Sequence, residues 1–175
     1  MPGVHSRLVL PEVPAMRAKH DEIPSHGDVR LARLLRRRIV DVLALEILAG
    51  RAHWEVKGPN HIALHGLFDQ IYANMDTHVV ELAAVVEELG GTVPGSAALR
   101  ARSHLLAPDT EDGSTGHGQV AELADRLGEF SRSLHRLQLK VARLGSDHAS
   151  VACVGLMHDV DKYRQMLNIH LHPRH

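Results

Sequence analysis

Apolar residues recur every three or four positions along four long stretches of the chain, which is the spacing of one face of an α-helix. Glycine and proline interrupt the pattern between these stretches. The spacing predicts long helices over residues 28–57, 60–89, 119–144 and 147–170. At ~1.5 Å per residue, each helix would be ~35–45 Å long. Long helices of similar length with apolar stripes predict an all-α four-helix bundle.

The residue types at the ends of these stretches agree with helix boundaries. Asp28 and Asn60 suit the position that caps a helix start, whereas Gly58-Pro59 and Gly90-Gly91 suit helix ends. The connection from residue 90 to residue 117 is long and interrupted, which predicts a crossover between helices two and three, with a short helix over residues 96–106. Residues 1–27 hold four prolines and no periodicity. We therefore expect an irregular tail at 1–27, the bundle at 28–171 and a short tail at 172–175.

Composition fits a helical bundle and excludes several other classes. Hydrophobic residues make up 44% of the chain but aromatics only 3%, so leucine, alanine and valine must build the core. The net charge of −1 gives no overall basic character that would indicate a nucleic-acid partner. The single cysteine, Cys153, excludes an internal disulfide, and its apolar neighbours predict a buried thiol. No signal-peptide pattern and no run of ~18 apolar residues occurs, so we expect a cytoplasmic protein without a membrane span.

Two histidines and a carboxylate form the strongest candidate site. His65 and Asp69 are four residues apart and share one helix face. His53 lies on the preceding helix and can fold back against them across the Gly58-Pro59 turn. Neutral imidazole with carboxylate is a ligand mixture that suits iron, zinc or manganese. The spacing therefore indicates a metal site.

The segment HWEVKGPNHIALHGLFD resembles the signature of the Dps family, the ferritin-like DNA-binding proteins of starved cells, whose pattern is H-W-x-V-x-G-x-x-F-x-x-L-H-x-x-F-D. The matching positions are His53, Trp54, Val56, Gly58, Leu64, His65, Phe68 and Asp69. His61 replaces the usual aromatic residue. The resemblance extends from about Val29 to the end of the last helix.

The resemblance implies a ferritin-like four-helix bundle that assembles into a cage of twelve identical subunits. It implies oxidation of iron(II) by peroxide or oxygen at a two-fold subunit interface, followed by storage of the iron inside and protection against oxidative damage. His53, His65 and Asp69 would be the ligands from one subunit, and Trp54 would pack beside them. The short helix over residues 96–106 also corresponds to one in this family.

Two positions depart from the family pattern. In Dps proteins the second subunit supplies an aspartate and a glutamate, and the corresponding positions here are Val80 and Ala84. Neither side chain can bind a metal, and iron oxidation depends on carboxylate oxygens. A family tryptophan in the last helix is replaced by Gln165. We therefore expect a non-standard, weakened ferroxidase centre.

Nearby residues offer two ways to compensate. His61 lies four residues before His65 and is either an added ligand or a residue that caps or packs at the helix start. Three acidic residues lie on or beside the face of Val80 and Ala84, and they either reach a displaced site or are solvated: Asp76, Glu81 and Glu87.

DNA binding is the second function that the resemblance raises. Phosphate contacts need clustered lysine or arginine, but charges in the first 30 residues balance. The strongest basic cluster lies on the first helix, and it is either a solvated face or a phosphate site: Arg33, Arg36, Arg37 and Arg38. Weak DNA affinity at neutral pH is expected, rising in acid as up to 15 histidines gain charge. The alternatives to a ferroxidase are a non-catalytic cage that binds DNA or stores metal, and a scaffold without either role.

Overall fold

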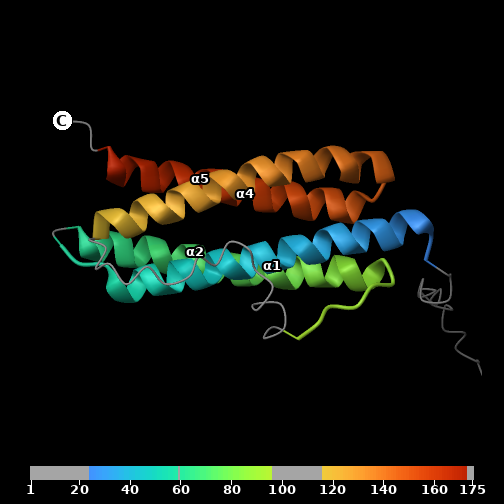
Figure 1. Ribbon diagram of the computed structural model, residues 1–175, viewed down its shortest axis with the longest axis horizontal. Coiled ribbons are helices and arrows are strands. Elements are labelled where there is room, and N and C mark those ends of the chain that lie inside the picture. The colour runs from blue at the N-terminus through green and yellow to red at the C-terminus, as the bar shows by residue number, and fades with distance from the viewer. Residues whose placement is uncertain (1–23, 59, 96–115, 173–175) are drawn as a thin grey trace, which may run out of the picture.

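The computed structural model describes residues 24–58, 60–95 and 116–172. Within these ranges the chain forms four helices and no strand: α1 (His26–Glu55), α2 (His61–Glu88), α4 (Gly116–Leu144) and α5 (Asp147–Leu171) (Figure 1). This confirms the predicted all-α four-helix bundle. The short helix expected over residues 96–106, most of the N-terminal tail and residues 173–175 lie outside the described residues.

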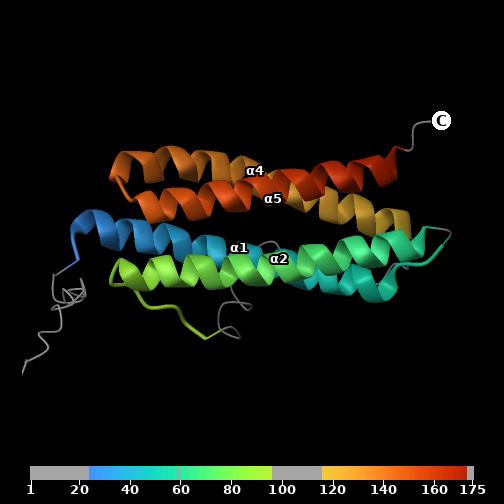
Figure 2. The same cartoon turned by 180° about the vertical axis from the view of Figure 1, so that it is seen from behind.

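The bundle consists of two helical hairpins stacked on each other. The first hairpin pairs α1 with α2, the second pairs α4 with α5, and the views from both sides show them as two layers (Figures 1 and 2). The end of α2 and the start of α4 lie at opposite ends of the bundle (Figure 1). This separation of the two helix ends agrees with the predicted long crossover. At ~1.5 Å per residue, the 30 residues of α1 span ~45 Å.

The first helix begins earlier than the sequence pattern predicted. Ser25 caps α1, and its hydroxyl accepts a hydrogen bond from the Asp28 backbone N–H at 3.1 Å. The Asp28 carboxylate in turn accepts the Ser25 backbone N–H at 3.0 Å, which completes a capping box. Assigning the cap to Asp28 was therefore wrong, because Ser25 is the cap and the serine–aspartate pair satisfies the first turn together.

Glycine and serine close three of the other helix ends. Gly90 and Gly145 both adopt φ +73°, a left-handed conformation that ends α2 and α4 at low steric cost. Ser146 caps α5 by accepting the Ala149 N–H at 3.3 Å. Asn60 occupies the cap position of α2 as predicted, but its side chain makes no capping hydrogen bond.

The core between the two layers is built from aliphatic side chains, as the composition predicted. Phe68, Phe130 and Tyr163 are the largest fully buried side chains. Cys153 is also fully buried, which confirms the expected buried thiol, and burial raises its pKa to about 11 against the opposing charge of Arg38. None of the described helices is long and apolar enough to cross a membrane.

Candidate metal centre

His53, His65 and Asp69 lie together at one end of the α1–α2 hairpin. The turn between α1 and α2 reverses the chain, so His53 near the end of α1 meets the first turns of α2. The His53 Nδ1 atom lies 2.8 Å from the Asp69 Oδ1 atom and 3.4 Å from the His65 Nδ1 atom. The two imidazole rings are 4.5 Å apart and meet edge to face. The structure thus brings together the three side chains that the sequence spacing grouped.

The donor atoms of this cluster fit part of a metal site. Ligand nitrogens and oxygens lie ~2.0–2.2 Å from an ion such as zinc, so neighbouring ligand atoms are separated by distances close to those between His53, His65 and Asp69. The described residues nevertheless contain no group of three or more histidine, cysteine or acidic side chains arranged to hold a metal within one chain. In the structure His53 pairs directly with Asp69, whose side chain remains 66% exposed. Within one chain this cluster, called the half-site below, is therefore incomplete as a metal site.

His61 lies beside the cluster, and one of its ring nitrogens makes a hydrogen bond to the backbone. Its Nδ1 atom lies 2.9 Å from the carbonyl oxygen of Gly58, and its ring centroid is 6.0 Å from that of His65. A carbonyl oxygen only accepts, so this contact places the proton on Nδ1 and leaves a lone pair on Nε2. A backbone carbonyl that fixes the tautomer in this way is common around metal-binding histidines. The contact with Gly58 thus orients the His61 ring, and in the neutral ring the Nε2 lone pair can bind a metal.

Large apolar side chains beside the cluster are exposed in the single chain. Trp54 is 82% exposed, and its indole ring contacts His53 edge-on at a centroid distance of 5.1 Å. Ile62, on the first turn of α2, is 77% exposed. An apolar surface of this kind around a polar cluster is typical of a protein–protein contact.

Val80 and Ala84 are far from the histidine cluster within one chain. They lie on an exposed face of α2, and Val80 is 64% exposed. Val80 lies eleven positions after Asp69, which is ~16 Å along a helix. Asp76 and Glu87 are likewise exposed on α2. These positions therefore approach a histidine cluster only if α2 pairs with a second subunit.

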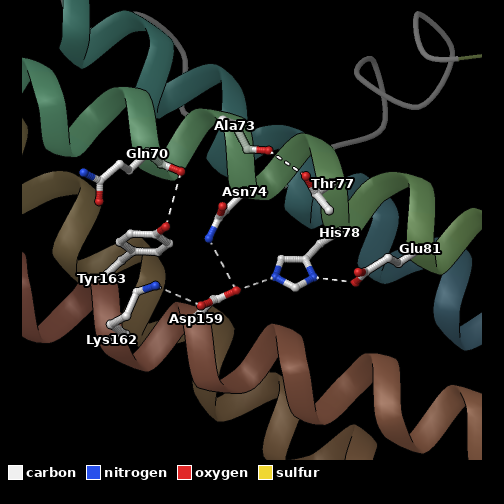
Figure 3. Close-up of polar contacts among 9 residues, drawn as sticks. All are labelled: Gln70, Ala73, Asn74, Thr77, His78, Glu81, Asp159, Lys162 and Tyr163. Atoms are coloured by element: carbon white, nitrogen blue, oxygen red, sulfur yellow. Dashed lines mark hydrogen bonds and ion pairs between the residues drawn. The ribbon is translucent and has the colours of Figure 1, made fainter.

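A second polar cluster, between α2 and α5, was missed in the sequence (Figure 3). His78 is buried, with its Nδ1 atom 2.9 Å from Glu81 Oε2 and its Nε2 atom 3.0 Å from Asp159 Oδ2. Asn74 and Lys162 also donate hydrogen bonds to the Asp159 carboxylate, at 3.4 and 3.1 Å. Glu81, which the sequence offered as a compensating ligand, is thus engaged with His78.

The charges in this cluster support one another. Burial disfavours the ionised form of Asp159, but hydrogen bonds from Lys162 and His78 outweigh it and lower the carboxyl pKa. The hydrogen bond to Asp159 raises the pKa of Lys162. The two ring nitrogens of His78 point in opposite directions, so Asp159 and Glu81 cannot share one ion with it. The cluster therefore joins α2 to α5 and is not a metal site.

A sequence signal for this cluster did exist. His78 falls on the buried stripe of α2 between Met75 and Leu82, where a polar residue needs a partner. On α5, Asp159 and Lys162 are three residues apart and face the same side. Sequence spacing alone could not show that these two helices bring the two groups into contact.

Comparison with known proteins places this architecture among ferritin-like proteins. Residues 32–172 match the Ferritin family, described as a ferritin-like domain. A DNA protection during starvation protein of Agrobacterium fabrum is 26% identical over 151 residues, covering 86% of this chain and 93% of that protein. The crystal structure of antigen TpF1 from Treponema pallidum superposes with a TM-score of 0.77 at 22% identity, covering 85% of this chain and 96% of that one. A Dps protein from Vibrio cholerae O1, described as a member of a broad superfamily of ferritin-like diiron-carboxylate proteins, has a TM-score of 0.76 at 17% identity, covering 87% and 99% of the two chains.

Proposed function

Because this chain belongs to the ferritin-like family and, within it, to the Dps proteins, we propose that it sequesters iron(II) and oxidises it at a two-fold subunit interface. The observation that carries the proposal is that the His53 Nδ1 atom lies 2.8 Å from Asp69 Oδ1 and 3.4 Å from His65 Nδ1. Iron is the substrate of this site. Removing iron(II) from solution suppresses formation of hydroxyl radicals and so protects against oxidative damage.

The geometry of α2 supports a two-fold arrangement. If α2 packs antiparallel against its own copy, Asp69 faces Val80 of the partner subunit and His65 faces Ala84 of the partner subunit. Both pairs centre on the same point, between Asn74 and Met75, which is also the midpoint of α2 (His61–Glu88). The exposed Trp54 and Ile62 would be covered in the same contact.

Each residue of the half-site has a distinct role in this proposal. His53 and His65 would bind iron through neutral imidazole nitrogens, and Asp69 would supply the negative charge that offsets the ion. His61 would add a third imidazole through its Nε2 atom. A set rich in imidazole also suits zinc, whereas manganese prefers more oxygen ligands. Oxidation should be slow, because Val80 and Ala84 supply no oxygen ligands for the growing charge.

A homo-oligomer follows from the same reasoning, and twelve subunits are the number that the Dps resemblance suggests. The two-fold contact would cover each half-site with helix α2 of the partner subunit, although the facing valine and alanine add no ligand. Light scattering of the full chain at micromolar concentration should report a large closed particle. A monomer under these conditions would contradict the interface site.

The second candidate function is a cage that stores metal or binds DNA without efficient oxidation. The apolar side chains of Val80 and Ala84 favour this second function, because a two-iron centre in this protein would lack two of its carboxylate ligands. Iron(II) binding without measurable oxidation by peroxide or oxygen would support this alternative over the ferroxidase.

Anaerobic titration of the full-chain oligomer with iron(II) tests the proposed site. His53→Ala and His65→Ala should each weaken iron(II) binding by at least about tenfold, since a lost ligand removes more than ~1.4 kcal/mol. His158→Ala is the matched control, because His158 is an exposed histidine on α5 away from the half-site. Unchanged binding in both site variants would place iron elsewhere and overturn the proposal.

A further inference from the structure

A hollow lined by positive charge lies between α1 and α4, away from the histidine cluster. Its volume is about 410 Å³. The cations that line it are Arg37, Arg38, Arg136, Lys140 and Arg143, and no carboxylate is among its described lining residues. A neighbouring hollow of about 580 Å³ shares Arg37 and Arg38 and adds Arg33, Arg36 and one carboxylate, that of Asp41, which pairs with Arg38. The basic cluster on the first helix is therefore only half of a larger one that the fold completes with α4.

Most of these cations lack a counter-charge, unlike arginines elsewhere in the protein. Arg51 pairs with Glu122 at 3.1 Å, and Arg126 pairs with Glu129 at 3.7 Å. By contrast, four cations of the smaller hollow are exposed and have no carboxylate partner among the described residues: Arg37, Arg136, Lys140 and Arg143. Like charges held together repel each other, so this arrangement favours a bound anion.

One arginine of the hollow is held in a fixed position. An Arg38 Nη2 atom lies 3.1 Å from Asp41 Oδ2, and its Nη1 atom donates a hydrogen bond to the Ser133 hydroxyl. The Arg38 side chain is only 18% exposed, so its guanidinium group forms part of the floor of the hollow. A guanidinium oriented by two neighbours is preorganised to bind phosphate or carboxylate oxygens.

The charge and shape of the hollow define the class of ligand. A single phosphate carries about two negative charges, fewer than the four cations of the smaller hollow that have no carboxylate partner among the described residues. The two hollows adjoin through Arg37 and Arg38, so an elongated anion can reach both. We propose that the surface between α1 and α4 is a binding site for an oligophosphate, a short chain of phosphoryl groups that is either free or carried by a nucleotide. The site uses none of the residues proposed to bind iron.

Isothermal titration of the full-chain oligomer with inorganic tripolyphosphate tests this site. The variant Arg37→Gln with Arg136→Gln removes one exposed cation from each helix and should weaken binding by at least about tenfold. The matched control is Arg30→Gln with Arg132→Gln, which removes the same charge from exposed positions on the same helices outside both hollows. The control should weaken binding less than the site variant does, because its side chains line neither hollow and cannot contact the bound anion.

Further measurements distinguish an oligophosphate site from a nucleic-acid surface and from a subunit interface. Orthophosphate should bind more weakly than tripolyphosphate, and ATP should compete with tripolyphosphate if nucleotides are also ligands. A failure of tripolyphosphate to bind at 50 mM salt, or an equal loss in the control variant, would overturn the proposal. Duplex DNA that binds this face and is not displaced by tripolyphosphate would overturn it in favour of an open nucleic-acid surface. Loss of the oligomer in the Arg37/Arg136 variant alone would overturn it in favour of a subunit interface.

Discussion

At the scale of single residues, burial decides the chemistry of Cys153. Its side chain is fully buried, and its pKa of about 11 leaves about one thiol in 1,000 ionised at pH 8. We therefore expect iodoacetamide to react with the native protein at pH 8 at least about 100-fold more slowly than with protein unfolded in guanidinium. Mass spectrometry of the alkylated protein over time measures both rates. Rapid alkylation of native protein would mean that the thiol is accessible.

The proposed role of His61 in metal binding depends on the orientation of its ring, which the carbonyl oxygen of Gly58 fixes. If its Nε2 atom binds metal, His61→Phe should weaken iron(II) or zinc binding by about tenfold or more while the oligomer stays intact. His61→Phe introduces the aromatic residue that the Dps pattern usually has here, so it should be tolerated structurally. Unchanged metal affinity, with only a small shift in melting temperature, would show that His61 serves helix packing alone.

At the scale of helices, the His78 cluster ties α2 to α5. His78→Ala leaves Asp159 and Glu81 without their shared partner inside the bundle, and it should cost about 1–3 kcal/mol of unfolding free energy. The exposed His158→Ala control should change stability by less than ~0.5 kcal/mol. Urea unfolding of both variants at pH 7 measures the difference. Equal stability of the two variants would mean that the cluster contributes nothing.

The same cluster predicts how stability depends on acid. The pKa of Asp159 in the folded protein lies below its ordinary value of 3.8, so the unfolded chain takes up the proton first as pH falls. The stabilisation is complete above pH 3.8 and is lost as pH falls below 3.8 towards the folded pKa. Asp159→Asn should therefore flatten the acid side of the stability curve, measured by urea unfolding between pH 5 and 2.5. An unchanged slope would show that Asp159 does not contribute to the acid dependence of stability.

At the scale of the whole molecule, the remaining test restores the two carboxylates of the Dps pattern that Val80 and Ala84 replace. Val80→Asp with Ala84→Glu would place two carboxylates opposite His53, His65 and Asp69 across the proposed interface. The rate of iron(II) oxidation should rise by at least about tenfold, which equals ~1.4 kcal/mol in the barrier. Stopped-flow absorbance of iron(III) formation measures this rate. A natural protein that already oxidises iron rapidly, with no gain in the variant, would contradict the weakened centre.

The double variant also provides a readout that does not depend on oxidation. Two added negative charges per subunit, four at each two-fold contact, should repel in the absence of metal and lower the melting temperature of the oligomer. Added iron(II) should restore stability, because a ligand that binds only the folded assembly raises its stability by mass action. Val80→Leu with Ala84→Val is an apolar control, and iron(II) should shift its melting temperature no more than it shifts that of the natural protein.

The sequence by itself determined the helical bundle and the grouping of His53, His65 and Asp69. Both depend on local periodicity, because residues four apart share a helix face and a short turn returns the chain onto itself. The sequence pattern misplaced the start of α1 by two residues, because Ser25 is the cap and Asp28 only completes its capping box.

Only the tertiary structure decided which distant residues meet. His78 contacts Asp159 across 81 positions of sequence, and α4 adds Arg136, Lys140 and Arg143 to the arginines of α1. Helical periodicity fixes which residues share a face of one helix, but it does not fix which face of another helix lies opposite. That choice is made by the packing of the two hairpins, which depends on the shapes of all the buried side chains at once.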